Sequence, residues 1–182
     1  MWMHLHQATR VFREGGVFAY PTEAVYGLGC DPLNEAAVQH LLSIKGRPVN
    51  KGLILLGSDL KQLSPFIQLR ERDYQQLSDH WPLATTLLID ASPLTPPWIR
   101  GDHAKVAVRV SRHPIARTLA EMCGSPLVST SANRSGLPAC RNHVQVAKQL
   151  GNDLDFIVTG QCDIRARPST IIDFDSGKVM RA

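Results

Sequence analysis

Short apolar segments typical of β-strands alternate with amphipathic segments typical of α-helices along the whole chain. This alternation predicts an α/β domain in which helices cover a largely buried sheet. The last strands follow one another closely, so we expect antiparallel pairs beside the parallel ones and a twisted, mixed, open sheet flanked by helices. The expected strands cover residues 17–20, 53–56, 85–89, 105–110, 126–130, 156–160 and 169–174, with a further strand at 178–182.

Glycine, asparagine and proline mark where the expected helices begin and end. Gly15 and Gly16 stop a first helix, and Asn34 can cap a second that runs to about Lys45. Gly124 stops a helix that begins near His113. The other expected helices cover residues 58–63, 70–80 and 142–150.

Composition favours one globular domain over residues 1–182. The chain has 182 residues, of which 43% are apolar, and it contains no internal repeat or linker-like segment. Charged residues interrupt every apolar run before it could span a bilayer, and the N-terminus lacks the pattern of a secretion signal. The four cysteines are scattered without a Cys-x-x-Cys pair, which favours free thiols. We therefore expect a soluble cytoplasmic protein with no membrane partner.

The charge balance gives only a weak indication of partners. The formal net charge is +4, and 14 arginines stand against 6 lysines. The planar guanidinium group suits phosphate and carboxylate ligands better than the lysine ammonium does. Charge alone fits an anion-binding protein and an ordinary solvated basic surface equally well.

A first unusual loop, AYPTEAVYGLGCDP, covers residues 19–32. It combines the hydroxyl of Thr22, the carboxylate of Glu23 and the phenol of Tyr26 with two glycines that let backbone approach closely. Glu23 or Asp31 could assist a proton transfer or a metal, although Asp31 before a proline is ordinarily a turn residue. The loop suggests a binding wall only if other loops supply matching chemistry.

A second loop, KGRPVNKG at residues 45–52, holds three cations and no acid. Lys45 can complement the dipole at a helix C-terminus. That explanation does not cover Arg47, which lies between Gly and Pro, or Lys51, which lies just before a buried strand. Because a polyphosphate needs several converging cations, we interpret this loop as anion-binding.

A third loop, VSTSANRSGLPACRN at residues 128–142, follows a buried strand and is rich in hydroxyl and amide groups. Ser129, Ser131 and Asn133 could cradle phosphate oxygens or a ribose, although such composition also caps helices. No Walker or Rossmann motif occurs in the chain. Arg109 in an alternating strand, Ser169 before a late strand, and Arg181 near the end of the sequence could complete a cationic cleft at the strand ends.

The sequence offers no evident nucleophile, triad or metal-spaced cluster of His and Cys. Cations and hydroxyls without a nucleophile fit a direct transfer between two substrates on a nucleotide. In such chemistry the protein mainly positions reactants and neutralises phosphate charge.

Three of these segments together resemble the signatures of the YrdC/TsaC family of threonylcarbamoyl-AMP synthases, in the short bacterial form. They are YPTEAVYGLGCD, the Lys-x-Arg of KGRP and the Ser-x-Asn of STSANRSG, in the family's order. The resemblance implies a YrdC-like fold and a nucleotidyltransferase that makes threonylcarbamoyl-AMP and pyrophosphate from L-threonine, bicarbonate or CO2, and ATP. It also implies Mg2+ bound with ATP, downstream threonylcarbamoyl-transferase proteins, and tRNA position 37 as the final target, with direct tRNA binding possible.

The resemblance assigns site residues by position. Lys45 and Arg47 match the Lys-x-Arg pair and are the expected catalytic residues. The residues expected at ATP are Lys45, Arg47, Lys51, Ser131, Asn133 and Arg181, and those expected at threonine are Thr22, Tyr26, Arg109, Ser129 and Ser169. No protein metal ligand is expected. The chain departs from the family pattern at Ala24, Leu56, Leu83 and Ala84.

Two other functions remain open from the residues. A non-catalytic module for structured RNA could use the same basic surface, because an A-form helix is read through phosphates and shape. A carbamoyl-adenylate transferase for metalloenzyme maturation is a third possibility, since related domains occur in such proteins.

Overall fold

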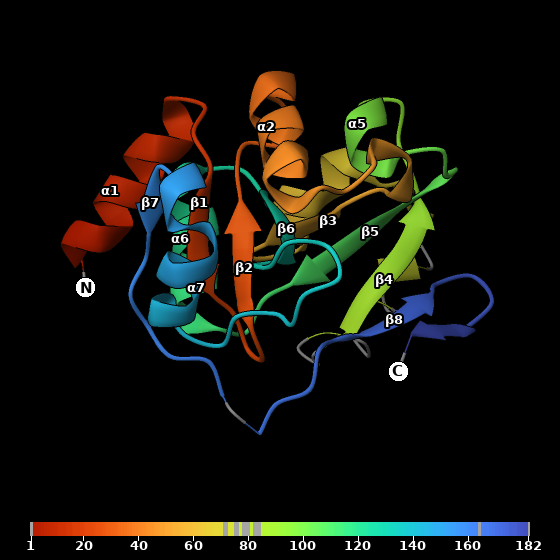
Figure 1. Cartoon of the computed structure of the whole chain (residues 1–182). Coiled ribbons are helices and arrows are strands. Elements are labelled where there is room, and N and C mark those ends of the chain that lie inside the picture. The colour runs from red at the N-terminus through yellow and green to blue at the C-terminus, as the bar shows by residue number, and fades with distance from the viewer. Residues whose placement is uncertain are drawn as a thin grey trace.

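A computed structural model describes residues 2–70, 73, 74, 77, 81, 85–163 and 165–181 (Figure 1). The helix predicted over residues 70–80 lies mostly outside the described residues, as do Leu83 and Ala84. Elsewhere the expected alternation of helices and strands is confirmed.

The described strands form one mixed sheet in the order β7-β1-β2-β6-β3-β5-β4-β8-β9. Strands β1/β7, β3/β5 and β4/β8 pair in parallel, and the remaining neighbours pair antiparallel. The predicted mixed open sheet is therefore confirmed. The strands are β1 Phe18–Pro21, β2 Tyr26–Gly29, β3 Ile54–Gly57, β4 Thr85–Asp90, β5 Lys105–Val110, β6 Leu127–Ser131, β7 Phe156–Ile157, β8 Thr170–Asp173 and β9 Val179–Arg181.

The helices begin and end where the sequence places caps. Asn34 accepts a hydrogen bond from the Ala37 amide at 3.1 Å at the start of α2, and Gly46 ends that helix in the left-handed region at φ 61°. The Asn142 side chain caps α7 in the same way. The helices are α1 Trp2–Arg13, α2 Glu35–Lys45, α3 Leu60–Leu63, α5 Pro97–Arg100, α6 Pro114–Cys123 and α7 His143–Leu150, with short 3-10 turns at Val49–Lys51, Ser64–Phe66 and Gly151–Asp153.

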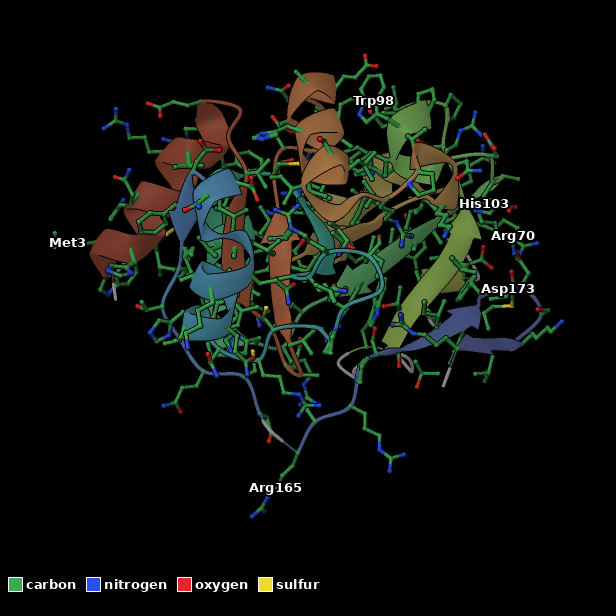
Figure 2. The ribbon with its side chains drawn as sticks, in the orientation of Figure 1. Met3, Arg70, Trp98, His103, Arg165 and Asp173 are labelled. Atoms are coloured by element: carbon green, nitrogen blue, oxygen red, sulfur yellow. The ribbon has the colours of Figure 1, made fainter. Side chains whose placement is uncertain are left out.

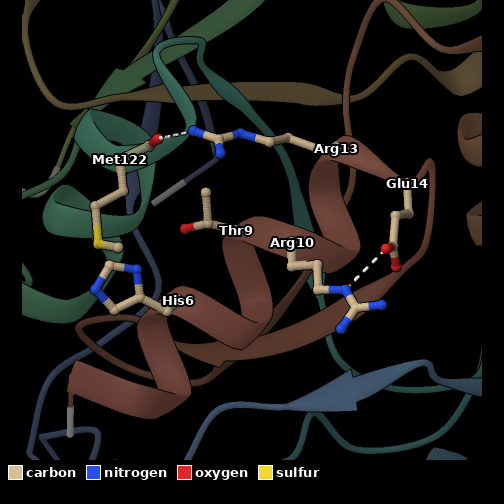
Figure 3. Close-up of a pocket in the computed structure, with 6 residues that line it drawn as sticks. All are labelled: His6, Thr9, Arg10, Arg13, Glu14 and Met122. Carbon is tan, nitrogen blue, oxygen red and sulfur yellow. Dashed lines mark hydrogen bonds and ion pairs between the residues drawn. The ribbon is translucent and has the colours of Figure 1, made fainter.

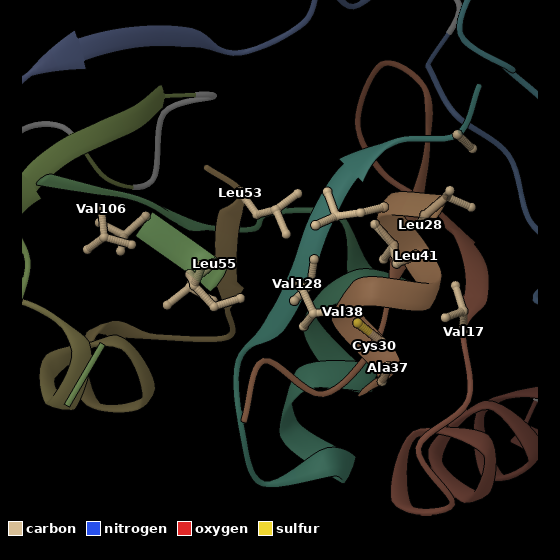
Figure 4. Close-up of a cluster of buried hydrophobic side chains, with 14 of the residues drawn as sticks. Val17, Leu28, Cys30, Ala37, Val38, Leu41, Leu53, Leu55, Val106 and Val128 are labelled. Carbon is tan, nitrogen blue, oxygen red and sulfur yellow. The ribbon is translucent and has the colours of Figure 1, made fainter. Parts of the chain in front are cut away.

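Side chains on the two faces of the sheet enter different hydrophobic clusters. On one face Leu28, Leu55 and Val128 belong to a cluster with side chains of α2 (Figure 4), and side chains of α5 and α7 complete that cluster. On the other face Leu56 and Leu127 pack with α1 and α6, which also contact each other. Because α1 and α6 lie toward the β1 and β7 end, these two helices do not extend over the rest of that second face (Figure 1).

Two short elements, β2 and α5, escaped the sequence prediction. Strand β2 has the sequence YGLG, which carries little strand signal. Its glycines make room for a buried ring, since a Cβ on Gly29 would lie 2.7 Å from Cε1 of Tyr20 and 3.1 Å from the Val128 carbonyl oxygen. The close approach expected at Gly29 therefore serves the packing of Tyr20.

All four cysteines are free thiols, as expected. Burial raises the pKa of the Cys123 thiol to about 11, and it also raises the pKa values of Cys140 and Cys162. The helices of the described residues are all too short or too polar to cross a membrane.

Candidate active site

A cavity of about 800 Å³ lies on the face of the sheet that α1 and α6 leave open. The alternation of strand β5 explains its floor. Lys105, Ala107 and Arg109 line the cavity, whereas Val106 and Val108 between them enter the opposite core. Ile54 of β3 and Ser129 of β6 line it in the same way, so strands distant along the chain share one wall.

Lys45 joins the second and third loops directly. Its Nζ atom donates hydrogen bonds to the Ser131 carbonyl, to the Asn133 carbonyl at 2.9 Å and to Asn133 Oδ1 at 3.1 Å. Ser131 Oγ donates to the same Oδ1 atom at 2.7 Å, and the Ser135 amide donates to the Lys45 carbonyl at 2.8 Å. The expected convergence of these two loops is therefore a feature of the fold.

These contacts place Lys45 and Asn133 behind the cavity wall rather than on it. Lys45 is buried, and neither residue is among those that line the cavity. Burial, with a smaller effect from the Arg47 charge, lowers the pKa of Lys45 to about 8. In this structure both side chains are engaged in holding the loops together.

Arg47 and Lys51 do line the cavity. Arg47 Nη2 donates to the carbonyls of Lys51 at 3.3 Å and Gly52 at 2.9 Å, so the guanidinium folds back over its own loop. Its Nε atom is buried with no hydrogen-bond partner in the described part of the chain, and burial lowers the pKa of the side chain. As a cation on this wall, Arg47 would attract an anion in the cavity.

A close backbone contact holds the Lys51 loop against the loop after α5. Gly52 and Gly101 both have positive φ, at 63°. A Cβ on Gly52 would lie 2.9 Å from the Arg100 carbonyl oxygen, and one on Gly101 would meet the Asn50 carbonyl. Only glycine permits this approach, which brings Arg100 to the same wall as Lys51.

Arg109 lies on the cavity floor, and its charge is neutralised by Glu23, which does not line the cavity. Its Nη2 atom forms a 2.5 Å ion pair with Glu23 Oε2, and its Nε atom is buried without a hydrogen-bond partner among the described residues. Burial would raise the pKa of Glu23, but the Arg109 charge and the Arg112 amide lower it below its ordinary value. Glu23 therefore carries its negative charge at neutral pH.

Thr22 and Tyr26 both line the cavity, but their hydroxyls are used within the protein. Thr22 Oγ1 donates to the Val25 carbonyl at 2.7 Å. The Tyr26 ring belongs to the core that contains Leu28, and its hydroxyl lies 2.9 Å from the Gly160 carbonyl. Burial raises the pKa of Tyr26 to about 12. The phenol proton is therefore donated within the protein.

The remaining predicted residues also lie on the cavity wall. Ser129 and Ser169 are buried there, and Ser169 Oγ is 2.9 Å from Thr86 Oγ1. Arg181 Nη2 donates to the Ser169 carbonyl at 3.0 Å, which links β9 to the segment before β8. That segment leaves β7 and passes below the sheet to β8, with Arg165 projecting from its lowest point (Figures 1 and 2).

Sequence reasoning did not single out several charged residues on the wall. The segment RGDHAK, which ends at the first residue of β5, supplies Arg100, Asp102, His103 and Lys105. The signal in the sequence that could have indicated these residues is the cluster of charged side chains around Gly101, directly before an apolar strand. Among the described lining residues Asp102 is the only acid, against seven Lys and Arg residues: Arg47, Lys51, Arg100, Lys105, Arg109, Arg167 and Arg181.

This excess of cations suits a polyanion and offers little to a bare metal ion. No group of three or more His, Cys, Asp or Glu side chains able to hold a metal ion occurs among the described residues. The hydroxyls of Ser129, Ser131 and Ser169 add neutral donors along the same wall. The wall can therefore bind a phosphate chain at one part and a small polar molecule at another.

A smaller hollow of about 510 Å³ lies between α1 and α6 and holds none of the predicted site residues (Figure 3). Arg10 pairs with Glu14 at 2.8 Å, and Arg13 Nη2 donates to the Met122 carbonyl at 3.4 Å. These polar groups already satisfy one another, so this hollow is the weaker candidate for a site.

Comparison with known proteins adds an independent finding. The model of the Sua5/YciO/YrdC family, described as telomere recombination, matches residues 10–182. A protein of Alkalilimnicola ehrlichii named threonylcarbamoyl-AMP synthase is 49% identical over 181 residues, which is 98% of this chain and 95% of the relative. A protein of the same name from Vibrio cholerae is 46% identical over 181 residues, 98% of this chain and 96% of its own.

Solved structures agree on the fold. P. abyssi Sua5 complexed with L-threonine superposes with a TM-score of 0.86 at 34% identity, over 93% of this chain and 50% of that one. E. coli YciO superposes with a TM-score of 0.88 at 26% identity, over 100% of this chain and 89% of that one. Full-length HypF, in a phosphate- and nucleotide-bound form, shares the fold at 20% identity and a TM-score of 0.83, but this chain spans only 28% of it.

Proposed function

This chain belongs to the Sua5/YciO/YrdC family, and from that premise we propose that it is a threonylcarbamoyl-AMP synthase. The reaction joins L-threonine, CO2 or bicarbonate, and ATP to give threonylcarbamoyl-AMP and pyrophosphate. It is a nucleotidyl transfer between two bound substrates. The names of the relatives from Alkalilimnicola ehrlichii and Vibrio cholerae support it, because each relative is covered over nearly its full length.

The observation that supports this proposal most is the contact of Lys45 with Ser131 and Asn133. It fixes the cationic loop beside the hydroxyl-rich loop, and both border one cavity. The bound threonine in the P. abyssi Sua5 structure adds that a relative of this fold takes this amino acid.

In the proposed reaction the threonine amine adds to CO2 and loses a proton, which gives a carbamate. A carbamate oxygen then attacks the α-phosphorus of ATP, the bond from that phosphorus to the bridging oxygen breaks, and pyrophosphate leaves. No protein nucleophile is required. The protein contributes position and charge, which is the main source of catalysis in phosphoryl and nucleotidyl transfer.

Arg47 and Lys51 would stabilise the negative charge that develops on the phosphates. Both lie on the cavity wall, and neither is paired with a carboxylate in the described structure. Ser131 and Arg181 lie on the same wall and would contact the nucleotide. Lys45 and Asn133 would act by holding the two loops in register, since their polar atoms already bind each other.

Arg109, which lies on the cavity floor, would receive the threonine carboxylate. Ser129 and Ser169 supply buried hydroxyls on the same wall. Thr22 and Tyr26 would contribute wall surface, and their hydroxyls could only accept hydrogen bonds from the ligand, because each donates its proton to a carbonyl, of Val25 and Gly160 respectively.

Mg2+ would enter with ATP. The lone carboxylate on the wall, among described residues, is that of Asp102, which fits a cation held mainly by phosphates and water. The ion would neutralise part of the phosphate charge.

We further propose that the product is consumed by transferase proteins that modify tRNA at position 37. Threonylcarbamoyl-AMP is a mixed anhydride, so an amine acceptor can displace AMP from it. Direct binding of tRNA to this chain would use exposed arginines such as Arg167, which lines the cavity, and its near neighbour Arg165.

The test is threonine-dependent pyrophosphate release with ATP, Mg2+ and bicarbonate, together with mass spectrometry of the product. The proposal requires release only when threonine and bicarbonate are both present, and a product with the mass of threonylcarbamoyl-AMP. Release without threonine would favour a carbamoyl-adenylate transferase. No release, combined with strong salt-sensitive binding of structured RNA, would favour a binding module.

A further inference from the structure

The seven cations on the cavity wall fall into two electrostatic groups. Two of them, Arg109 and Lys105, are paired with carboxylates. The other five form no ion pair in the described structure: Arg47, Lys51, Arg100, Arg167 and Arg181.

Both paired cations belong to one strand face. Lys105 and Arg109 lie four residues apart on β5 and line the cavity together. Lys105 Nζ binds Asp173 Oδ2 at 2.8 Å and Asp175 Oδ2 at 2.5 Å. Asp173 and Asp175 belong to the β8–β9 hairpin, where Figure 2 shows Asp173 at the edge of the sheet.

The carboxylates that pair them are not among the lining residues. Glu23 is absent from the wall although its neighbours Thr22 and Ala24 line it, and Asp173 and Asp175 are absent as well. The cavity therefore contacts the cations and none of the three carboxylates; Glu23 is largely buried, whereas Asp173 and Asp175 lie on the β8–β9 hairpin.

Glu23 is itself firmly held. Its Oε1 atom accepts hydrogen bonds from the Arg112 amide at 2.9 Å and from Ser111 Oγ at 3.3 Å. Its carbonyl accepts one from the Asp163 amide at 2.8 Å. Glu23 thus joins the β1–β2 loop, the end of β5 and the segment before β8, and its charge stays fixed behind Arg109.

From this arrangement we propose that Glu23 is a specificity-determining residue that keeps Arg109 neutralised and so reserves the β5 part of the cavity for a zwitterion, excluding phosphate. A polyanion gains most beside unpaired cations, whereas a zwitterion needs a donor for its carboxylate in surroundings of little net charge. The inference rests on the proposed function, because it assumes that a triphosphate and an amino acid share one cavity. It explains how two adjacent cationic regions could take different ligands.

The test replaces Glu23 with the isosteric amide, Glu23→Gln, and uses inorganic phosphate as the probe. Without its counter-charge the buried Arg109 is an unpaired cation that favours an anion. Phosphate should therefore become a competitive inhibitor against threonine, with an inhibition constant at least about tenfold lower than in the wild type. Titration calorimetry without substrates should show a phosphate site that the wild type lacks.

Two variants serve as controls. Glu121→Gln removes one partner of an exposed ion pair, 3.0 Å to Arg117, on α6 away from the cavity, and it should behave as wild type. The double variant Glu23→Gln, Arg109→Gln should lose the new phosphate site, because that site is Arg109 itself. If Glu23→Gln alone does not fold, the double variant Asp173→Asn, Asp175→Asn tests the same principle at Lys105.

The outcomes separate this inference from the proposed function. A Glu23→Gln protein with wild-type phosphate binding and wild-type inhibition would overturn the inference. A general loss of folding stability without competitive phosphate inhibition would also overturn it, because it would indicate a purely structural role. Wild-type protein that releases no pyrophosphate with threonine would instead refute the proposed function. Titration calorimetry with phosphate would still decide whether Glu23 keeps phosphate away from Arg109.

Discussion

Replacing Arg47 should separate catalysis from folding. Arg47→Ala removes a wall cation with no carboxylate partner and a buried Nε donor that has no acceptor in the described structure. Removing one preorganised donor to developing charge typically costs 10²–10³-fold in kcat, or about 3–4 kcal/mol. We expect a loss of this size in kcat/KM for ATP, measured as threonine-dependent pyrophosphate release.

The structural cost of the same substitution should be much smaller. Arg47→Ala loses two hydrogen bonds to backbone carbonyls, at 3.3 and 2.9 Å. Such bonds contribute about 0.5–1.5 kcal/mol each, so the free energy of unfolding should fall by about 1–3 kcal/mol. For a chain of this size that lowers the melting temperature by roughly 2–12 °C.

Arg134→Ala is the matched control for this experiment. Arg134 donates to the Ile44 carbonyl at 3.1 Å and pairs with Asp153 at 2.6 Å, but it does not line the cavity. Its loss should lower stability by a similar amount and leave turnover within about threefold, since no substrate contact is removed. Normal activity in Arg47→Ala, or equal loss of activity in both variants, would refute the reasoning.

Three further predictions concern stability. Native Lys45 has a pKa of about 8 and its ordinary value is 10.5, so between these pH values the unfolded chain holds a proton that the folded chain has lost. Between pH 8 and 10.5 the free energy of unfolding of the wild type should therefore rise relative to that of Lys45→Met. Urea titrations of the two proteins at several pH values measure this difference. Thr86→Val removes the 2.9 Å contact with Ser169 Oγ and should cost about 1 kcal/mol while raising the KM for threonine, which melting curves and kinetics can check. Leu55→Ala empties a fully buried site in β3 and should cost about 2–5 kcal/mol in chemical denaturation, and a cost below 1 kcal/mol would contradict the packing described.

Helix boundaries and the sheet class followed from local sequence signals. Asn34 and Gly46 bracket α2 because each residue satisfies backbone groups through its own side chain or its own φ. Such signals depend on near neighbours in the chain. The YGLG strand could not be recognised in this way, because its glycines are explained by the Tyr20 ring packed against them.

The sequence predicted which loops meet at the candidate site, but it did not predict which side chains contact one another there. Motif order indicated that the loops of Lys45 and Asn133 converge, and Lys45 does contact Asn133. The sequence could not show that these two side chains bind each other behind the wall, or that Glu23 neutralises Arg109. Both facts depend on pairings across 88 and 86 positions of the chain, which no local pattern encodes.

The most direct measurement is a crystal structure of the protein with a non-hydrolysable ATP analogue and L-threonine. The account predicts the triphosphate beside Arg47 and Lys51, with the threonine carboxylate on Arg109 in the same cavity. A nucleotide bound outside this cavity, or phosphates seated on Arg109 with threonine elsewhere, would contradict it.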